Sequence, residues 1–161
     1  MTSADPLAPG PLAGLRVVDL ATARAELTGR ILADLGAEVI KIEPPAGAAA
    51  RRLPPFEDGR ERDPNGSLYW AAVALGKRSV VLDILQPADR ARLLDLLAGA
   101  DVLVVSYDPG TLDRLGLGYA VVRERNPELI YVSVTPFGQD GPEALTPATP
   151  LTIEAAGGLV G

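Results

Sequence analysis

The chain has 161 residues and a net charge of −6, which argues against a nucleic-acid or anionic-membrane surface. It has no cysteine and no histidine, so thiolate chemistry, disulfides, Ser-His-Asp catalysis and most zinc sites are excluded. Apolar residues make up 47% and charged residues 22%, a mixture typical of one soluble globular domain. We therefore expect a cytoplasmic protein with neither a signal peptide nor a membrane span.

The first ten residues, MTSADPLAPG, are rich in proline and small residues and predict a disordered tail over residues 1–10. Residues 15–43 predict a strand, a helix and a second strand. The helix carries an apolar stripe of Leu27, Ile31, Leu32 and Leu35 and ends at a C-cap glycine, Gly36. One helix between two apolar strands implies a right-handed crossover and a parallel sheet.

Residues 44–66 form a proline-rich segment that suits neither a helix nor a central strand. Four arginines lie in it, and they could meet a polyanionic ligand or simply be balanced by the acids between them: Arg51, Arg52, Arg60 and Arg62. A short helix follows at 67–75, capped by Ser67, and Trp70 is expected in the core rather than against a ligand.

The rest of the chain predicts strands at 78–84, 101–106 and 129–135. Helices are predicted from Pro87 to about residue 100, over 111–117 and 119–126, and over 149–160. The fold class is therefore α/β, a mostly parallel sheet with flanking helices. Because ligands bind at the carboxyl ends of parallel strands, residues 19–25 and those from Glu43 onward are expected at the working edge.

No residue pattern on its own identifies a reaction. Glu43 stands where a dinucleotide-binding fold places its ribose-binding acid, but the first strand–helix turn, DLATARAE, lacks the glycines that admit a pyrophosphate. Acids such as Asp19, Glu43, Asp101 and Asp108 are expected to be solvated strand ends. Glu154 is either a poised carboxylate in an apolar segment or, by the simpler interpretation, a surface side chain.

Several segments together resemble the class III CoA-transferases (the CaiB/BaiF-like family that includes formyl-CoA transferase, carnitine CoA-transferase and α-methylacyl-CoA racemase). They occur in the family's order and at nearly its spacing: PLAGLRVVDL, RILADLGAEVIKIEPP, GKRSVVLDI, ADVLVVSYDPGTLDRLGLGY, NPELIYVSVTPFGQDGP and IEAAGGL. The resemblance covers residues 11–161 and implies the N-terminal, incomplete part of the family's Rossmann-like large domain.

The resemblance implies that CoA is transferred between an acyl-CoA and a carboxylic acid by an aspartate nucleophile, through an anhydride and an aspartyl-CoA thioester. The family's aspartate lies beyond IEAAGGL, so no catalytic residue is assigned and we expect this chain alone to be inactive. No covalently bound cofactor and no metal are expected. The family also implies an interlocked homodimer for the full-length protein.

Leu82, Tyr107 and Arg114 match CoA-contacting positions of the family, and Arg114 is a permanent cation suited to a phosphate. The chain departs from the family pattern at Glu26, Leu85, Ser106 and Asp108, and we expect the two added acids to weaken attraction to the phosphates of CoA. Two alternatives stay open: a non-catalytic scaffold or partner subunit, and, more weakly, an NAD(P)-binding oxidoreductase domain.

Overall fold

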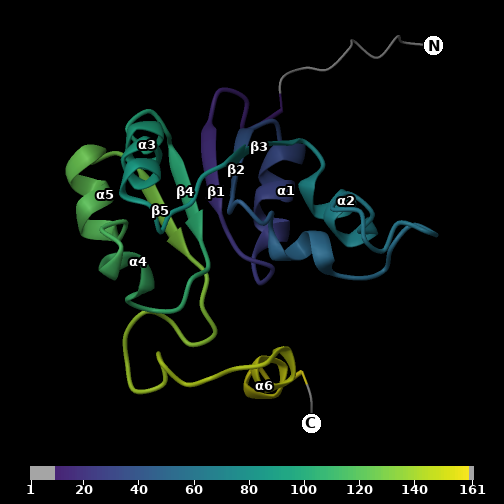
Figure 1. Cartoon of the computed structure of the whole chain (residues 1–161). Coiled ribbons are helices and arrows are strands. Elements are labelled where there is room, and N and C mark those ends of the chain that lie inside the picture. Colours follow the sequence, from purple (N-terminus) through teal and green to yellow (C-terminus); the bar gives the residue numbers. More distant parts are fainter. Residues whose placement is uncertain (1–9, 160–161) are drawn as a thin grey trace, which may run out of the picture.

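The computed structural model describes residues 10–159 and contains a five-stranded sheet in the order β3-β2-β1-β4-β5 (Figure 1). Every neighbouring pair is parallel, which confirms the predicted sheet. The strands are β1 (Arg16–Leu20), β2 (Glu38–Glu43), β3 (Lys77–Val81), β4 (Val102–Val105) and β5 (Ile130–Ser133). Valine-rich runs form β1 and β4, two of the three inner strands, which suits strands covered on both faces.

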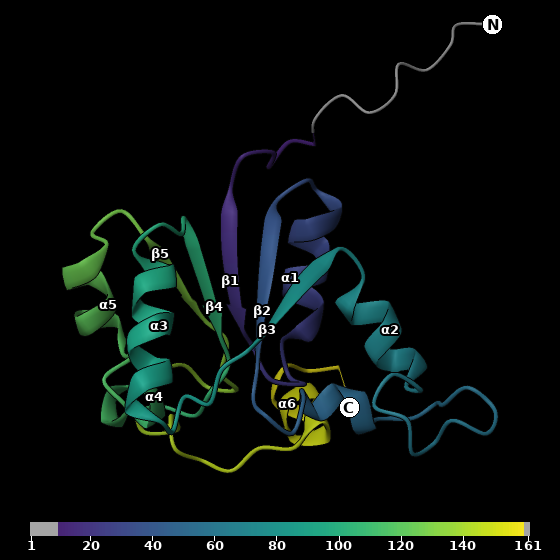
Figure 2. The same ribbon diagram turned by 45° about the horizontal axis from the view of Figure 1, so that its top comes forward.

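Helices cover both faces of the sheet, as Figures 1 and 2 show. α1 and α2 lie on one side, and α3, α4 and α5 on the other. Their bounds are α1 (Glu26–Asp34), η1 (Ala49–Arg52, a 3-10 turn), α2 (Leu68–Ala74), α3 (Pro87–Leu97), α4 (Thr111–Arg114), α5 (Tyr119–Arg125) and α6 (Pro150–Ala156). The larger core lies under α3 and α5, where Leu93, Leu97 and Val122 pack against inner strand residues.

The predicted order of elements is confirmed, and the bounds differ mainly at the ends. β3 ends at Val81 instead of residue 84, and α6 ends at Ala156 instead of residue 160. The predicted caps are also found: Ser67 accepts from the Trp70 amide, and Gly36 follows α1 with φ +98°. The predicted tail over residues 1–10, Gly10 apart, lies outside the described residues, as does Val160.

Of the four residues in the apolar stripe of α1, Leu32 packs against the core on that side of the sheet, and the other three are exposed. Leu27, Ile31 and Leu35 are 58%, 50% and 40% exposed, whereas Glu26 and Gly29 are buried. A Cβ added at Gly29 would collide with the Asp19 carboxylate and lie 3.0 Å from Lys77 Cε. Gly29 therefore allows α1 to approach a group of charged side chains that the apolar pattern does not indicate.

Four charged side chains form a buried ionic cluster between α1 and the sheet: Asp19, Glu26, Lys41 and Lys77. Each is at most 2% exposed. Lys77 Nζ lies 2.7 Å from Asp19 Oδ2 and 3.3 Å from Glu26 Oε2, while Lys41 Nζ lies 3.3 Å from Asp19 Oδ1 and 3.0 Å from Glu26 Oε1. The prediction that Asp19 is a solvated strand end is thus wrong. Two cations and two anions balance one another, as burial of charge requires.

Glu43 is the second strand-end acid that is buried instead of solvated. Its carboxylate accepts from Arg51 Nε at 2.6 Å and Arg51 Nη2 at 2.8 Å, from the Ala48 amide at 2.8 Å and from the Ser79 hydroxyl. Burial alone would raise its pKa, but these hydrogen bonds outweigh burial and lower the pKa of Glu43 to about 2. A bidentate ion pair therefore fastens the 44–66 segment to the sheet.

Charged side chains hold the 44–66 segment in place, through contacts within the segment and with its neighbours. Arg51 also stacks on Trp70, with its guanidinium carbon 4.2 Å from the ring centroid, and Trp70 itself is buried, as predicted. Arg60 pairs with Glu57 and, at 2.7 Å, with Asp63. The predicted balance by acids within the segment is therefore found for Arg60, whereas Arg51 pairs with Glu43 of β2.

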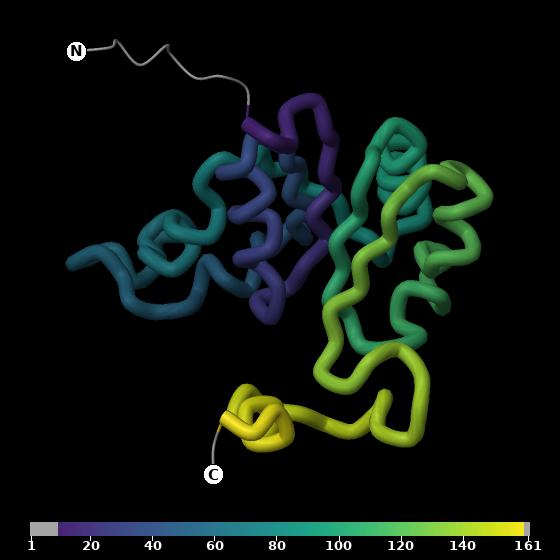
Figure 3. The backbone as a smooth tube through the Cα atoms, turned by 180° about the vertical axis from the view of Figure 1, so that it is seen from behind, coloured from purple at the N-terminus to yellow at the C-terminus, as the bar shows by residue number. Residues whose placement is uncertain are grey.

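α6 lies apart from the helical layers, below the carboxyl ends of the strands (Figures 1 and 3). None of its residues is buried; Leu151 is 64% exposed, and Leu159 just after the helix is 82% exposed. Glu154 is also exposed, in agreement with its simpler interpretation as a surface side chain. Among residues 10–159, no helix has the length and apolar character needed to cross a bilayer.

Candidate functional site

The candidate site lies where β1 and β4 end side by side. After β1 the chain turns toward α1, and after β4 it turns toward α4 on the opposite face (Figure 1). The crevice between the two turns is lined by Arg24, Asp108 and Pro109. The turns are linked through Thr22 and Ser106: the Thr22 amide donates to Ser106 Oγ at 2.7 Å, and the two hydroxyl oxygens lie 2.8 Å apart. These hydrogen bonds hold the two turns together.

The buried ionic cluster also positions the first turn. Asp19 Oδ1 accepts from the Ala21 amide at 2.9 Å, and Lys41 donates to the Ala21 carbonyl. Both main-chain groups of Ala21 are thus held by buried charges, directly before Thr22. The buried charges of Asp19 and Lys41 therefore make the start of the turn rigid.

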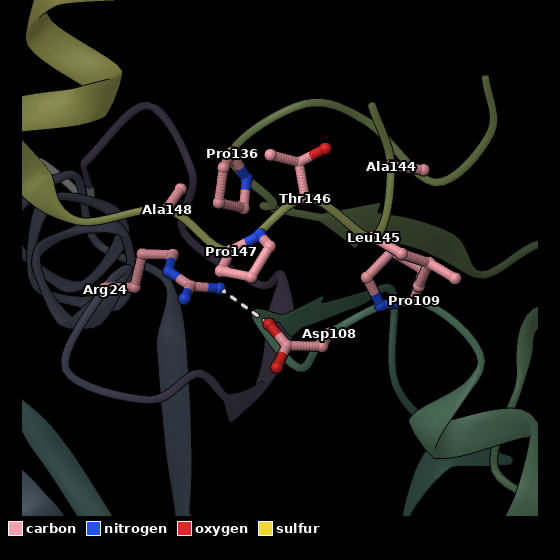
Figure 4. A pocket seen from close by; sticks show the side chains of 9 residues that line it. All are labelled: Arg24, Asp108, Pro109, Pro136, Ala144, Leu145, Thr146, Pro147 and Ala148. Carbon is pink, nitrogen blue, oxygen red and sulfur yellow. Dashed lines mark hydrogen bonds and ion pairs between the residues drawn. The ribbon is translucent and has the colours of Figure 1, made fainter. Parts of the chain in front are cut away.

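One ion pair also bridges the two turns. Arg24 Nη1 lies 3.2 Å from Asp108 Oδ1, and the two side chains are 35% and 75% exposed (Figure 4). In contrast to the buried cluster, each partner keeps solvent-accessible surface, so solution ions can compete for it.

Two cavities meet at Arg24. The switch-point cavity has a volume of about 350 Å³ and is lined by Arg24, Asp108, Pro109, Pro136 and residues 144–148 (Figure 4). The α6 cavity has a volume of about 640 Å³ and is lined by residues 22–24, Ala49, Ala148, Pro150, Ile153 and Glu154. Both volumes lie within the usual range for small-molecule sites.

The three predicted CoA contacts lie toward the α3–α4 side of this edge. Leu82 is 7% exposed and belongs to the larger core, and Tyr107 packs partly buried against the same core, where burial raises its pKa. Arg114 is exposed on α4; its Nη2 donates to Thr111 Oγ1 at 3.2 Å, and no ion-pair partner for it occurs among residues 10–159. None of the three lines either of the two cavities.

The dinucleotide interpretation conflicts with the geometry of Glu43. Both of its carboxylate oxygens are occupied by protein donors, and the residue is 1% exposed. A ribose diol therefore has no access to the acid that a dinucleotide site would need. The described residues also hold no cluster of three or more acidic ligands suited to a metal ion.

Comparison with known proteins decides the family. A profile described as CoA-transferase family III matches residues 12–161, nearly the whole chain. The chain belongs to CoA-transferase family III.

Family III relatives resemble the chain in sequence and in structure. The chain is 40% identical over 163 residues to an acetyl-CoA:oxalate CoA-transferase of Acetobacter aceti, covering 99% of this chain and 40% of that protein. It is 39% identical to a probable fatty acyl-CoA transferase of Mycobacterium tuberculosis, covering 92% and 37%. A crystal structure of a CaiB/BaiF family protein from Brucella suis superposes with a TM-score of 0.85 at 38% identity, covering 94% and 40%. The chain thus spans about 40% of the length of these relatives.

The departures from the family III pattern are accommodated locally. Ser106 supports the first turn, Glu26 belongs to the buried ionic cluster, and Asp108 pairs with Arg24. Each added acid therefore has a cation beside it. Leu85, the remaining departure, is uncharged and 68% exposed.

Sequence reasoning missed Arg24 and the Thr22–Ser106 link. A signal for Arg24 was present, because it is the only cation in the turn DLATARAE that follows the first strand. The link to Ser106 joins residues 84 positions apart and required knowledge of which strands are neighbours.

Proposed function

We propose that the full-length protein is an acyl-CoA:carboxylate CoA-transferase. In this proposal the chain contributes the residues that follow β1, β3 and β4 to the CoA-binding edge of the sheet. The observation that carries the proposal is the cavity at the β1–β4 switch point of a family III fold. The names of several relatives support it, since they pair a CoA thioester with an acid: acetyl-CoA:oxalate, succinate–glutarate and succinyl-CoA:mesaconate CoA-transferase.

In this proposal Leu82, Tyr107 and Arg114 contact CoA. The Leu82 side chain is buried, so its contribution comes from main-chain groups at the end of β3. Tyr107 is partly buried and packs against the larger core just after β4. Arg114 has no competing carboxylate among residues 10–159, so its guanidinium is available for a phosphate oxygen.

The proposed chemistry needs a carboxylate nucleophile and a site from which water is excluded. The family resemblance places that aspartate beyond the matched segments, so the 161-residue chain is expected to bind CoA without transferring it. Water exclusion matters because an anhydride intermediate hydrolyses readily, and the cover is expected from the remainder of the protein. An interlocked cytoplasmic homodimer is the proposed state of the full-length protein.

Calorimetric titration of the chain with CoA tests the proposal. We expect saturable binding that weakens about tenfold in Arg114→Ala, since a charge-assisted hydrogen bond to phosphate is lost. Arg125→Ala is the matched control, because Arg125 is an exposed arginine on the neighbouring helix α5, 3.8 Å from Asp95. Absence of CoA binding would reject the proposal for this edge and favour a scaffold or partner-subunit role.

A further inference from the structure

Arg24 is the cation common to both cavities. The switch-point cavity contains Arg24 and Asp108 as its charged residues, and the α6 cavity contains Arg24 and Glu154. The rest of both linings is small or apolar, with prolines, alanines and Leu145 prominent in the first. A ligand that enters either cavity therefore meets one guanidinium in largely apolar surroundings.

The hydrogen-bonding capacity of this guanidinium is mostly unused. Arg24 donates through Nη1 to Asp108 Oδ1 at 3.2 Å, and among residues 10–159 its Nε and Nη2 have no acceptor. A guanidinium can present two parallel donors to one carboxylate. The single contact with Asp108 shows that a carboxylate oxygen can reach the guanidinium. It uses one donor, so the other donors stay available to a carboxylate that accepts two hydrogen bonds.

The charges of the linings favour a single carboxylate over the polyphosphate part of a nucleotide. Each cavity pairs the one cation with one acid, so neither lining carries net positive charge. A diphosphate would place two linked anionic groups beside one guanidinium and a repelling carboxylate, whereas a carboxylic acid needs to place only one carboxylate group against the guanidinium, even when it carries a second.

We propose that Arg24 binds the carboxylate of the acceptor acid, which displaces Asp108 from the guanidinium. This inference rests on the proposed CoA-transferase function and adds the residue that selects an anionic acceptor. Asp108 keeps the guanidinium paired when the acceptor is absent. Since Asp108 is 75% exposed, its carboxylate can turn to solvent on displacement at little cost.

Chemical-shift titration of the ¹⁵N-labelled chain with succinate tests this inference. We expect saturable shifts of the Arg24 Nε–H signal and of the amides of Arg24 and Asp108, and none with the uncharged succinamide. Arg24→Gln should weaken binding at least about tenfold, with Arg24→Lys in between because it keeps the charge and loses the fork. Asp108→Asn should tighten binding several-fold because the internal competitor is removed.

Arg78→Gln is the control, because Arg78 is an exposed arginine that pairs with Glu38 at the opposite, amino edge of the sheet. It should bind succinate as the unaltered chain does. The inference is overturned if succinate leaves the Arg24 signals unshifted, if Arg24→Gln binds equally well with native amide dispersion, or if pyrophosphate binds Arg24 more tightly than succinate. CoA binding is measured separately, so succinate binding without CoA binding would reject the proposed function alone, and the reverse would reject this inference alone.

Discussion

Two sets of ion pairs that lie close together differ in burial and in their number of charged partners. In the buried ionic cluster, Asp19 and Glu26 each meet both Lys41 and Lys77 away from water. At the crevice, Arg24 meets only Asp108, through one contact and with both side chains accessible. The first arrangement fixes the shape of the turn, whereas the second leaves charge available to a ligand. We therefore expect ligand binding at the pair with fewer contacts.

Breaking the buried ionic cluster should have the largest effect. Lys41→Met leaves two carboxylates facing one lysine in the core, and we expect the free energy of unfolding to fall by about 3–5 kcal/mol. Chemical denaturation measures it. The paired variant Lys41→Met/Glu26→Gln restores one cation to one anion, so it should be more stable than the sum of the two single changes predicts. Additive effects would contradict the idea of a charge-balanced cluster.

Acid should weaken the Glu43–Arg51 pair next. Because the pKa of Glu43 is about 2 in the folded chain and 4.5 in its ordinary state, the folded chain binds fewer protons there. The stabilisation is complete above pH 4.5 and is lost as the pH falls toward 2, at most about 3 kcal/mol. The unaltered chain and Glu43→Gln should therefore differ in unfolding free energy at pH 7 and converge near pH 2. If the difference stays constant over that range, the lowered pKa of Glu43 is contradicted. Glu57→Gln serves as the control, because Glu57 is exposed.

Removing the crevice pair should have the smallest effect on stability. Arg24→Gln breaks a solvent-accessible ion pair, so we expect the unfolding free energy to change by less than about 1 kcal/mol. Thermal or chemical unfolding at low and high salt measures it, and the small difference should shrink further as salt rises. A loss as large as that of Lys41→Met would mean that Arg24 is structural, and the contrast between the two regions would be wrong.

The order of the elements was predictable because local sequence signals mark where helices and strands begin and end. Gly36, Ser67, Gly76 and Pro87 start or end elements through local backbone preferences that act within a few residues. The all-parallel sheet follows from helices placed between apolar strands.

The inward face of α1 was not predictable in the same way. A periodic stripe shows that apolar side chains share one side, but not that this side meets the sheet. Glu26 points toward the sheet because it pairs there with two lysines. One of them, Lys77, is 51 residues further along the chain. A separation of 58 residues likewise explains why Asp19 was expected in solvent, since its partner Lys77 belongs to a strand that is not its neighbour.

The site was predictable in its location and not in its residues. The carboxyl edge follows from fold class alone, but Arg24 gains its role from cavities formed with residues 144–148, more than a hundred positions away. Leu82, Tyr107 and Arg114 came from family resemblance, and their contact with CoA stays a prediction.

The stacking of Arg51 on Trp70 has a practical consequence. Trp70 is the single tryptophan of the chain, so its fluorescence arises from one place, where a guanidinium lies 4.2 Å from the ring centroid. Release of the 44–66 segment would remove that cation and alter the emission before the sheet itself opens. The protein therefore carries an intrinsic optical reporter that distinguishes local detachment of this segment from global unfolding.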